Sequence, residues 1–350
     1  MVFSIGKVNF GSDKCIVIAE AGVNHLGNMQ YAEELIKTAS RAGADIIKFQ
    51  TYKASTLTTK NAPRFWDWEG EVNPLGSQHD SYAKLDSFQK NDYINLINLC
   101  KKYEIEFMST PFDEDAVDML VSIGMKGFKI ASCDLNNLPF LAYIAKKNLP
   151  ILMSTGAATI DEIKNAVDVI HQEGNKNILI MHCTLCYPTD AKDSNLSAIL
   201  DIKKHFPGYL VGLSDHTLGT IIPAASVLYG AVAIEKHYTF DKTLPDSADH
   251  WLSLDEGELS LMIKQIRELE MAVGNGKKEL LLCETAAHKN ARRSVVANLN
   301  IMKGQLITKD MVAIKRPGTG LAPVFIDRIV GSIAKNDIPH DHLFSFDDFE

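Results

Sequence analysis

Two histidines in this 350-residue sequence follow short apolar segments. His216 lies in VGLSDHTLGT (residues 211–220), and His237 lies 21 residues later in AVAIEKHYTF. If the two segments are neighbouring strands, both imidazoles end at one edge of a sheet and can share a divalent ion with water and substrate. Taken singly, a histidine at a strand end serves equally well as a hydrogen-bonding residue. The metal site is therefore a hypothesis about the pair.

Three lysines, Lys48, Lys129 and Lys236, stand inside apolar segments. A lysine buried among apolar side chains must be paired with an anion or lose its proton. One interpretation is a structural ion pair with Glu20 or Glu235. A second is a clamp for an anionic substrate. A third is an amine that forms a Schiff base with a carbonyl substrate, as in aldolases.

Eight short apolar segments, each followed by a helical pattern, recur along the chain and supply the framework for these residues. The segments end at Glu20, Gln50, Thr110, Ser132, Thr155, Cys183, Ser214 and His237. They are rich in Ile, Val and Phe and mostly lack strict alternation, which is typical of strands buried on both faces. Thr159 and Glu162 form a capping-box pattern at the start of one helix. Eight strand–helix units in about 260 residues predict a closed (β/α)8 TIM barrel, with an open doubly wound sheet as the alternative.

Polar or ionisable side chains end every one of these strands. They are Glu20, Lys48, Gln50, Thr110, Lys129, Ser132, Thr155, His182, Asp215, His216, Lys236 and His237. In a barrel they would converge on the C-terminal rim, where active sites lie. Hydroxyls of Thr110, Ser132 and Ser214 would complete a phosphate or carboxylate site beside the lysines. The pattern therefore predicts a substrate pocket.

The chain changes character after GNGKKE (residues 274–279). We expect a barrel domain over residues 1–275 and a small β-rich domain over 284–350, which contains SVVANLNI and MVAIKRP. The polar stretch CETAAHKNARRS (residues 283–294) is expected to run as an extended connector. Residues 51–88 form an unusually long connection with no clear pattern, and loops of that length are usually functional lids or disordered.

The composition excludes several classes of protein. A net charge of -8 argues against a nucleic-acid binder, and no apolar run approaches the length of a membrane span. Six cysteines are too few for a disulfide scaffold, so Cys183 and Cys186 are interpreted as reduced thiols. The N-terminus lacks a secretory signal pattern. We therefore expect a cytoplasmic protein.

Taken in order, eight stretches resemble the sialic acid synthase family, whose members make nonulosonic acids. They are IAEAGVNHLGN, AGADIIKFQTYK, FMSTPFD, FKIASCDLNNLPFL, PILMSTGAAT, GLSDHTLG, IEKHYTFDKTLPDSADHWLSL and KRPGTG. They extend from about residue 16 to the C-terminal region and cover nearly the whole chain. No single stretch is decisive, but eight in the same order are specific.

The resemblance implies a condensation of phosphoenolpyruvate with the open-chain aldehyde of an N-acylated mannosamine-type or 2,4-diacetamido-6-deoxy hexose, with release of phosphate. It implies a divalent ion on His216 and His237, commonly manganese, with magnesium or cobalt as alternatives. Glu20 is the implied proton-transfer group, and Asp134 is the implied contact to sugar hydroxyls. The phosphoenolpyruvate contacts are implied to be Lys48, Thr110, Lys129, Ser132 and Ser214. The sugar contacts are implied to be Gln50, Tyr187, Asp249 and Arg316.

The resemblance also implies that residues 284–350 are an antifreeze-like (SAF) domain, swapped across a homodimer. Arg316 would then complete the site of the partner subunit. Two positions depart from the family pattern. Asp134 stands where many synthases have glutamate, and Leu185 stands where neuraminate synthases often have asparagine. Both changes alter the wall that faces the sugar, so the reaction is implied more firmly than the identity of the sugar.

Three other functions compete with this interpretation. A Schiff-base aldolase would need no metal. A metal-dependent amidohydrolase is disfavoured because no His-x-His follows the first strand. A non-catalytic carbohydrate-binding or ice-binding protein leaves the polar strand ends unexplained. Release of phosphate from phosphoenolpyruvate that requires both an amino sugar and a divalent ion would separate these possibilities.

Overall fold

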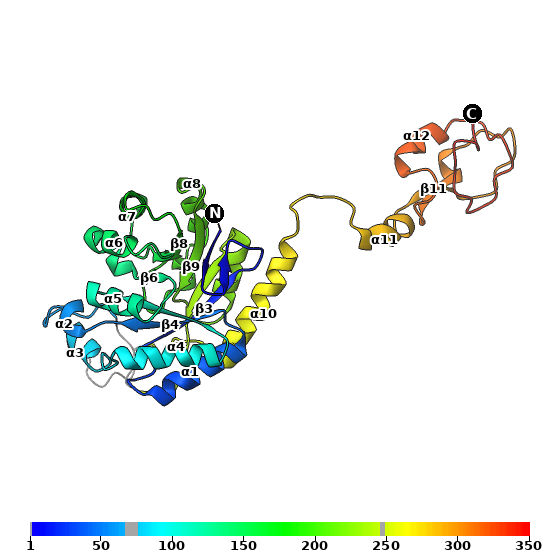
Figure 1. Cartoon of the computed structure of the whole chain (residues 1–350). Coiled ribbons are helices and arrows are strands. Elements are labelled where there is room, and N and C mark those ends of the chain that lie inside the picture. The colour runs from blue at the N-terminus through cyan, green and yellow to red at the C-terminus, as the bar shows by residue number, and fades with distance from the viewer. Residues whose placement is uncertain (1, 67–75, 246–248) are drawn as a thin grey trace. The chain divides into compact units, whose positions relative to one another are not determined.

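A computed structural model describes residues 2–66, 76–245 and 249–350 of the chain. The chain divides into two compact units, Met1–Gly274 and Asn275–Glu350 (Figure 1). No helix of the described residues is long and apolar enough to cross a membrane.

The first unit is built on eight parallel strands. They are β3 (Ile16–Gly22), β4 (Ile46–Thr51), β5 (Glu106–Pro111), β6 (Phe128–Ile130), β7 (Ile151–Ser154), β8 (Ile178–Cys183), β9 (Leu210–Asp215) and β10 (Ala233–His237). The strands pair in the order β5-β4-β3-β10-β9-β8-β7-β6, and the two end strands, β5 and β6, pack side by side. The predicted TIM barrel is therefore confirmed, and the alternative of an open sheet is wrong. Because β3 pairs with both β4 and β10, the chain's first and last barrel strands are neighbours.

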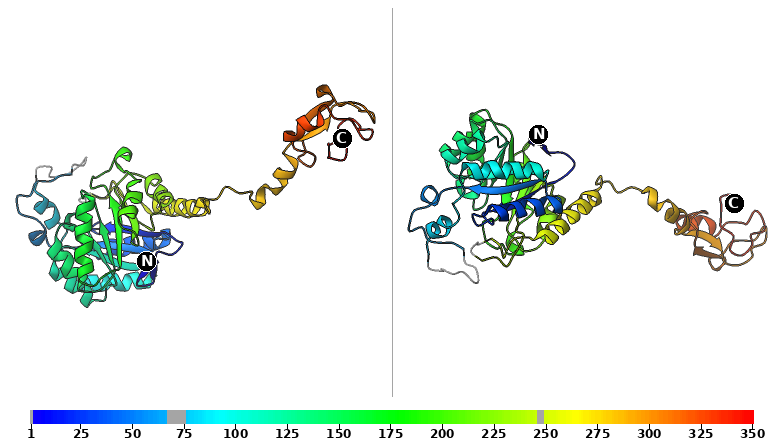
Figure 2. Two further views of the ribbon diagram at one scale, coloured as in Figure 1. Left: turned by 90° about the horizontal axis from the view of Figure 1, so that it is seen from above. Right: turned by 60° about the horizontal axis from the view of Figure 1, so that its bottom comes forward.

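Helices surround these strands, and Figure 2 shows their arrangement from two further directions. They are α1 (Met29–Ala42), α4 (Lys90–Lys102), α5 (Glu114–Ser122), α6 (Leu138–Ala145), α7 (Ile160–Gln172), α8 (Ala198–His205), α9 (Ile221–Ala225) and α10 (Glu256–Val273). Sequence signals explain several ends. The Thr159–Glu162 capping box begins α7, and Gly43, with φ of 96°, ends α1 in the left-handed conformation that glycine adopts without strain.

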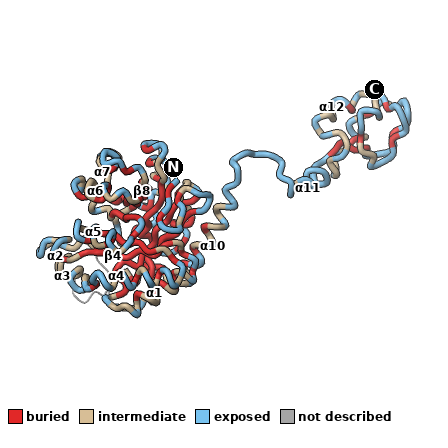
Figure 3. Tube along the Cα trace, in the orientation of Figure 1, coloured by how far each residue is buried: buried red, intermediate tan, exposed pale blue. Residues whose placement is uncertain are grey.

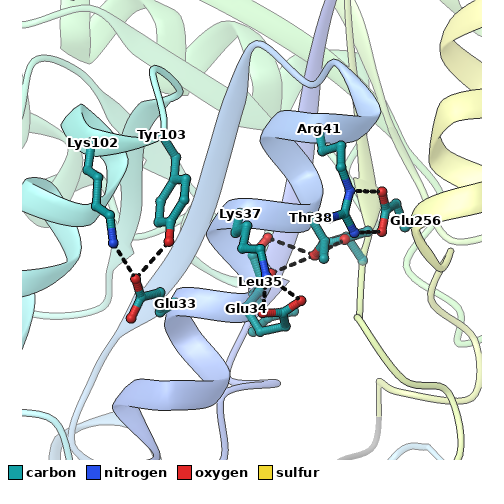
Figure 4. A network of polar contacts seen from close by, with 10 residues as sticks. Glu33, Glu34, Leu35, Lys37, Thr38, Arg41, Lys102, Tyr103 and Glu256 are labelled. Carbon is teal, nitrogen blue, oxygen red and sulfur yellow. Dashed lines mark hydrogen bonds and ion pairs between the residues drawn. The ribbon is translucent and has the colours of Figure 1, made fainter.

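Polar contacts connect α1 to two neighbouring helices (Figure 4). Glu33 accepts hydrogen bonds of 2.8 Å from Lys102 and from the hydroxyl of Tyr103, at the end of α4. On the next turns of α1, Arg41 forms a two-pronged ion pair with Glu256, at the start of α10. These contacts thus join the helices that follow β3, β4 and β10, the three adjacent strands that include the first and the last of the barrel.

Side chains on the strands alternate between two buried layers. Figure 3 colours the chain by burial and shows that the barrel strands are largely buried. The outward layer, which includes Val17, Ala19 and Ile47, packs beneath the helices. The inward layer is apolar at the N-terminal ends of the strands, where Ile18 and Met181 lie. Two residues further along the strands, toward their C-terminal ends, the inward side chains become polar. The barrel interior is therefore packed with apolar side chains at its N-terminal end, which we call the floor, and lined with polar side chains at its C-terminal end.

An N-terminal hairpin, which we did not predict, closes that floor. Strands β1 (Phe3–Ile5) and β2 (Val8–Phe10) pair antiparallel, and Phe3, Ile5 and Phe10 belong to the same apolar cluster as the lower inward layer. Its turn lies against the start of β5, where the backbone N–H of Lys7 donates to Glu106.

The long connection after β4 contains two short helices, α2 (Ala54–Leu57) and α3 (Gln78–Ala83), where the sequence showed no clear pattern. Its residues 67–75, with Trp68 and Pro74, lie outside the described residues. The expected extended connector is also wrong in part, because Thr285–Asn290 forms the helix α11. Its alanines favour helix and no proline interrupts it.

The second unit has its own apolar core. Strands β11 (Ser294–Ala297) and β12 (Val312–Lys315) pair antiparallel, and the short helix α12 (Ile326–Ile329) follows. Val295, Ile307, Ile329 and Phe344 are buried together. A core of this kind allows the unit to be stable without the barrel.

Candidate active site

A cavity of about 300 Å³ opens among the C-terminal ends of the barrel strands. It is lined by most of the residues that the sequence singled out, namely Glu20, Lys48, Gln50, Thr110, Lys129, Ser132, Asp134, Tyr187, Ser214, His216 and His237. The period of two along each strand explains this convergence: Ile18 and Glu20 share one face of β3, and Glu235 and His237 share one face of β10. The predicted pocket is therefore present.

Two lysines and two glutamates form a buried charge cluster at the bottom of this cavity. Lys48 Nζ lies 2.5 Å from Glu20 Oε2 and 3.7 Å from Glu235 Oε1. Lys129 Nζ lies 3.3 Å from the same Glu235 oxygen. The ion pairs with Glu20 and Glu235 that the sequence suggested are thus present, and both lysines also face the cavity. Glu235 was not predicted as a site residue, although its place two residues before His237 gave the signal.

Burial and charge act in opposite directions on these carboxyl groups. Burial raises the pKa of Glu20 to about 7, with a further rise from Glu235 and a partial offset from Lys48. Burial also disfavours the charged form of Glu235, but Lys129 and Lys48 outweigh it and lower the pKa of that group. Burial likewise opposes the charge on Lys48, but Glu20 and Glu235 outweigh it and raise the pKa of Lys48. Of the two carboxyl groups in this cluster, Glu20 is therefore the one that can exchange a proton near neutral pH.

Hydroxyl groups surround the lysines. Thr110 accepts a 3.0 Å hydrogen bond from Lys48, and Ser214 donates to Glu235 over 3.2 Å. Ser154 at the end of β7 also lines the cavity, and its buried hydroxyl has no hydrogen-bond partner within the described part of the chain. We did not predict Ser154, because serine in a strand is common and only its inward position makes it informative.

The two histidines lie together in the cavity, with ring centroids 5.4 Å apart. The Nδ1 of His216 lies 2.9 Å from the carbonyl oxygen of Thr184 and donates to it in the neutral ring, which leaves Nε2 as the acceptor. Burial, together with nearby positive charge such as that of Lys48, holds the pKa of His237 well below its ordinary value, so that this ring is neutral. Burial has the same effect on His216, but interactions with Cys183 and the carbonyl of Thr184 outweigh it and raise the pKa of that ring. Neutral imidazole is the form that binds metal.

These residues fit an ion held by two imidazoles, with water and substrate in the remaining positions. Nowhere in the described ranges do three or more His, Cys, Asp or Glu side chains gather as a complete metal site. The fit therefore rests on two adjacent imidazoles, each of which can present an unprotonated nitrogen to an ion. Cys183 lines the same cavity as a free thiol, 3.9 Å from the Nδ1 of His216.

Three polar residues lie on the side of the histidines. Asp249 Oδ2 is 3.5 Å from the Nδ1 of His237, and burial raises the pKa of this carboxyl to about 6. The ring of Tyr187 packs on His216 with centroids 4.2 Å apart. Gln50 donates to Glu20 over 3.0 Å. The predicted sugar contacts of the barrel therefore adjoin both the histidines and Glu20.

Some strand-end residues do not face the cavity. Lys236 points to the other face of the sheet and pairs with Asp215, so the idea that it belongs to an anion clamp is wrong. His182 bonds to the carbonyl of Ser194, and Thr155 donates to the carbonyl of Met181. Each of these residues is adjacent in sequence to an inward-facing residue, so its own side chain points to the opposite face of the sheet and away from the cavity. Arg316 belongs to the second unit, where it is exposed directly after β12.

The sequence model described as the NeuB family matches residues 35–278, which is more than half of the chain. The chain belongs to the NeuB family. The resemblance seen in the sequence is thereby confirmed, and a SAF domain matches residues 292–350.

Relatives of this NeuB family member carry several activities. It is 39% identical to the N,N'-diacetyllegionaminic acid synthase of Legionella pneumophila, over 93% of this chain and 92% of that protein. It is 33% identical to the pseudaminic acid synthase of Campylobacter jejuni strain 81-176, over 97% of this chain and 98% of that protein. Among solved structures it is similar to the N-acetylneuraminic acid synthetase of Leptospira borgpetersenii in complex with citrate. The TM-score there is 0.72 at 33% identity, covering 82% of this chain and 94% of the other.

The wall that differs from the NeuB family pattern is partly apolar. Leu185 lines the cavity opposite the backbone of Gly156, where an added Cβ would lie 3.0 Å from the Cβ of Leu185. Leu57, Phe65 and Tyr82, from the connection after β4, line it as well. Asp134 takes part in the same cavity, and burial raises its pKa. This part of the cavity therefore combines apolar side chains with the carboxyl group of Asp134.

Proposed function

We propose that this protein condenses phosphoenolpyruvate with an N-acylated amino-hexose to form a nine-carbon 2-keto-3-deoxy acid and inorganic phosphate. One observation carries the proposal: two buried lysines, several hydroxyl groups and two adjacent imidazoles lie together in one cavity. The synthase activities printed for the relatives support the same reaction.

Phosphoenolpyruvate would bind at the lysine end. Lys48 and Lys129 can donate charge-assisted hydrogen bonds to its phosphate and carboxylate, and Thr110, Ser132, Ser154 and Ser214 can complete the set of donors. The buried hydroxyl of Ser154 gains a partner when an anion arrives. With Glu20 close to half protonated near neutral pH, the cluster carries net positive charge, which favours a trianionic ligand.

The sugar aldehyde would lie at the histidine end, against Gln50, Tyr187 and Asp249. A divalent ion on His216 and His237, for which we propose manganese with magnesium or cobalt as alternatives, would polarise the aldehyde carbonyl. The methylene carbon of phosphoenolpyruvate then forms a bond to C1 of the sugar. Water adds at C2 of the former phosphoenolpyruvate, and the C2–O bond to phosphate breaks.

Proton movement in this sequence is assigned to Glu20. Its pKa of about 7 allows it to take one proton from the attacking water and pass it to the alkoxide formed at C1 of the sugar, while the second proton of the water leaves with the phosphate as the C2 hydroxyl becomes a ketone. The two lysines balance the charge of the leaving phosphate. Asp134 is proposed to orient sugar hydroxyls from the rim.

The sugar we propose is a 2,4-diacetamido-6-deoxy hexose in preference to N-acetylmannosamine. A methyl group packs favourably on Leu57, Leu185 or Phe65, whereas an additional hydroxyl there would lose hydrogen bonds to water without replacement. The 39% identity to an N,N'-diacetyllegionaminic acid synthase supports this choice.

A homodimer is proposed as the active unit, with Arg316 completing the partner subunit's site. Its exposed guanidinium offers a fixed fork of donors to sugar oxygens. The six free cysteines agree with the reducing cytoplasm that we propose as the compartment.

Two alternatives are less well supported. A Schiff-base lysine must be a neutral amine, whereas Lys48 and Lys129 lie against carboxylates and the pKa of Lys48 is raised. A non-catalytic carbohydrate-binding or ice-binding role leaves the buried charge cluster without purpose.

The test is release of inorganic phosphate from phosphoenolpyruvate by the full chain, with each component omitted in turn. Release that requires both an amino-hexose and a divalent ion supports the proposal. Trapping of a lysine by borohydride without metal would instead support the aldolase.

A further inference from the structure

A buried ion pair lies directly behind the two histidines. Strands β9 and β10 pair with Ser214 opposite Glu235 and with Asp215 opposite Lys236. Ser214 and Glu235 meet inside the cavity, so the alternation of side chains sends Asp215 and Lys236 to the opposite face of the sheet. There the Nζ of Lys236 lies 2.6 Å from Asp215 Oδ2. Each partner is the residue immediately before one of the histidines.

Thr217 closes this pair into a ring of contacts. Its hydroxyl donates to Asp215 Oδ2 over 2.8 Å, and its backbone carbonyl accepts a short hydrogen bond from Lys236. Lys236 is 1% exposed, and Asp215 and Thr217 are buried with it. The residues on both sides of His216 are therefore bound to the residue that precedes His237.

Other contacts hold the ring of His216 and the backbone of both histidines. The backbone carbonyl of His216 accepts from the N–H of Thr189, and its Nδ1 bonds to the carbonyl of Thr184, each over 2.9 Å. The backbone carbonyl of His237 accepts from the N–H of Leu254 over 2.9 Å. Once the two strand ends are joined, the backbone positions from which the two rings extend are fixed relative to each other.

Stability alone is a weak explanation for such a pair. Two charges removed from water lose hydration that their mutual attraction only partly replaces, and apolar residues of similar size are often as stabilising. Buried ion pairs are better suited to selecting one arrangement of the elements they join. We propose that Lys236 and Asp215 are positioning residues that set the separation and orientation of His216 and His237 for one shared divalent ion. This inference rests on the metal site of the proposed function.

The test uses the double variant Lys236→Met with Asp215→Asn. The double change avoids the uncompensated carboxylate that Lys236→Met alone would leave, and asparagine still offers an oxygen to the Thr217 hydroxyl. Binding of Mn²⁺ to the full chain without substrates is measured by electron paramagnetic resonance. We expect Mn²⁺ affinity at least tenfold lower, with an unchanged affinity for phosphoenolpyruvate measured without metal.

Lys203→Met provides a matched control. Lys203 donates to the carbonyl of Gly230 over 2.9 Å and does not line the cavity, so the same substitution there removes a lysine contact away from the histidines. It should leave Mn²⁺ affinity unchanged. A merely structural role for Lys236 predicts that both variants lose thermal stability and that neither loses Mn²⁺ affinity.

The outcomes separate this inference from the proposed function. If the wild type binds Mn²⁺ and the folded double variant binds it equally well, the positioning role is overturned and the proposed function stands. If the wild type binds no divalent ion yet condenses the substrates, the proposed metal site fails, and this inference fails with it. Should the double variant not fold, Thr217→Val decides, since it keeps both charges and removes one contact. It should lower Mn²⁺ affinity several-fold, and an unchanged affinity would overturn the positioning role.

Discussion

Replacing Lys129 by methionine tests the assignment of the anion end of the cavity. The Lys129 side chain is 4% exposed, and its Nζ lies 3.3 Å from Glu235. Hydrogen bonds to charged groups contribute roughly 1.5–3 kcal/mol, which corresponds to about one to two decades of affinity. We therefore expect the KM for phosphoenolpyruvate to rise about 10- to 100-fold, with a much smaller change in the KM for the sugar.

The same substitution removes a charge partner from Glu235. Lys48 remains 3.7 Å from that carboxylate, so the cost to stability should stay below the roughly 3–5 kcal/mol of a fully broken buried pair. Combining Lys129→Met with Glu235→Gln removes both charges. The double variant should recover thermal stability without recovering the KM for phosphoenolpyruvate.

The assay is initial-rate phosphate release with phosphoenolpyruvate varied at saturating sugar and metal. Thermal unfolding of each variant is followed in parallel, and Lys203→Met again serves as the control. A KM for phosphoenolpyruvate that stays at the wild-type value in folded Lys129→Met would refute the clamp. Lys129 would then be a structural partner of Glu235 and nothing more.

Four further predictions follow from the site. His237→Ala should abolish metal-dependent turnover while thermal unfolding shows an intact fold; full activity in the metal-stripped variant would contradict the metal assignment. Because burial raises the pKa of Glu20 from 4.5 to about 7, the folded state holds this proton more tightly, so the free energy of unfolding should decrease as pH rises between those values. Denaturant titrations should show a weaker pH dependence in Glu20→Gln, and an identical dependence would count against the shift. Leu185→Asn should shift substrate preference from the 6-deoxy sugar toward N-acetylmannosamine, as measured with the two sugars in competition. The shift should be about fourfold if one methyl contact of about 0.8 kcal/mol is lost. A wild type that already prefers N-acetylmannosamine would overturn the proposed sugar. Mixing inactive Arg316→Ala protein with inactive His237→Ala protein should restore activity toward about a quarter of wild type if two subunits share a site. If activity does not return after subunit exchange has been verified by mass, Arg316 acts in its own chain's site or in none.

The sequence predicted those features that depend on periodicity along single elements. Eight apolar segments with helical patterns between them were sufficient for the barrel, because buried parallel strands and capped helices each leave a local pattern. The strand ends predicted the cavity for the same reason. Glu20, Lys48 and His237 stand at those strand ends, and all three line the cavity.

Features that depend on pairing between distant segments were harder to predict. The hairpin of β1 and β2 is too short to show a pattern, and its apolar residues become interpretable only against the barrel floor. The sequence of β10 did not indicate which face of the sheet Lys236 lies on, because both faces of this strand are buried and its residues show no alternation of apolar and polar side chains. Ser154 could not be distinguished from other buried serines, because its inward position and the lack of a partner for its hydroxyl in the described structure are properties of the fold.

The closed floor of the barrel has a consequence for the kinetics. Phe3, Ile5 and Phe10 fill the N-terminal end, so reactants enter and leave past the rim where Phe65 is 60% exposed. The lysines lie deeper, and each is 3% exposed. In the proposed binding mode, a sugar at the histidines would stand between phosphoenolpyruvate and solvent. Steady-state kinetics should be ordered, with phosphoenolpyruvate first on, and the sugar-derived acid should leave before phosphate can escape.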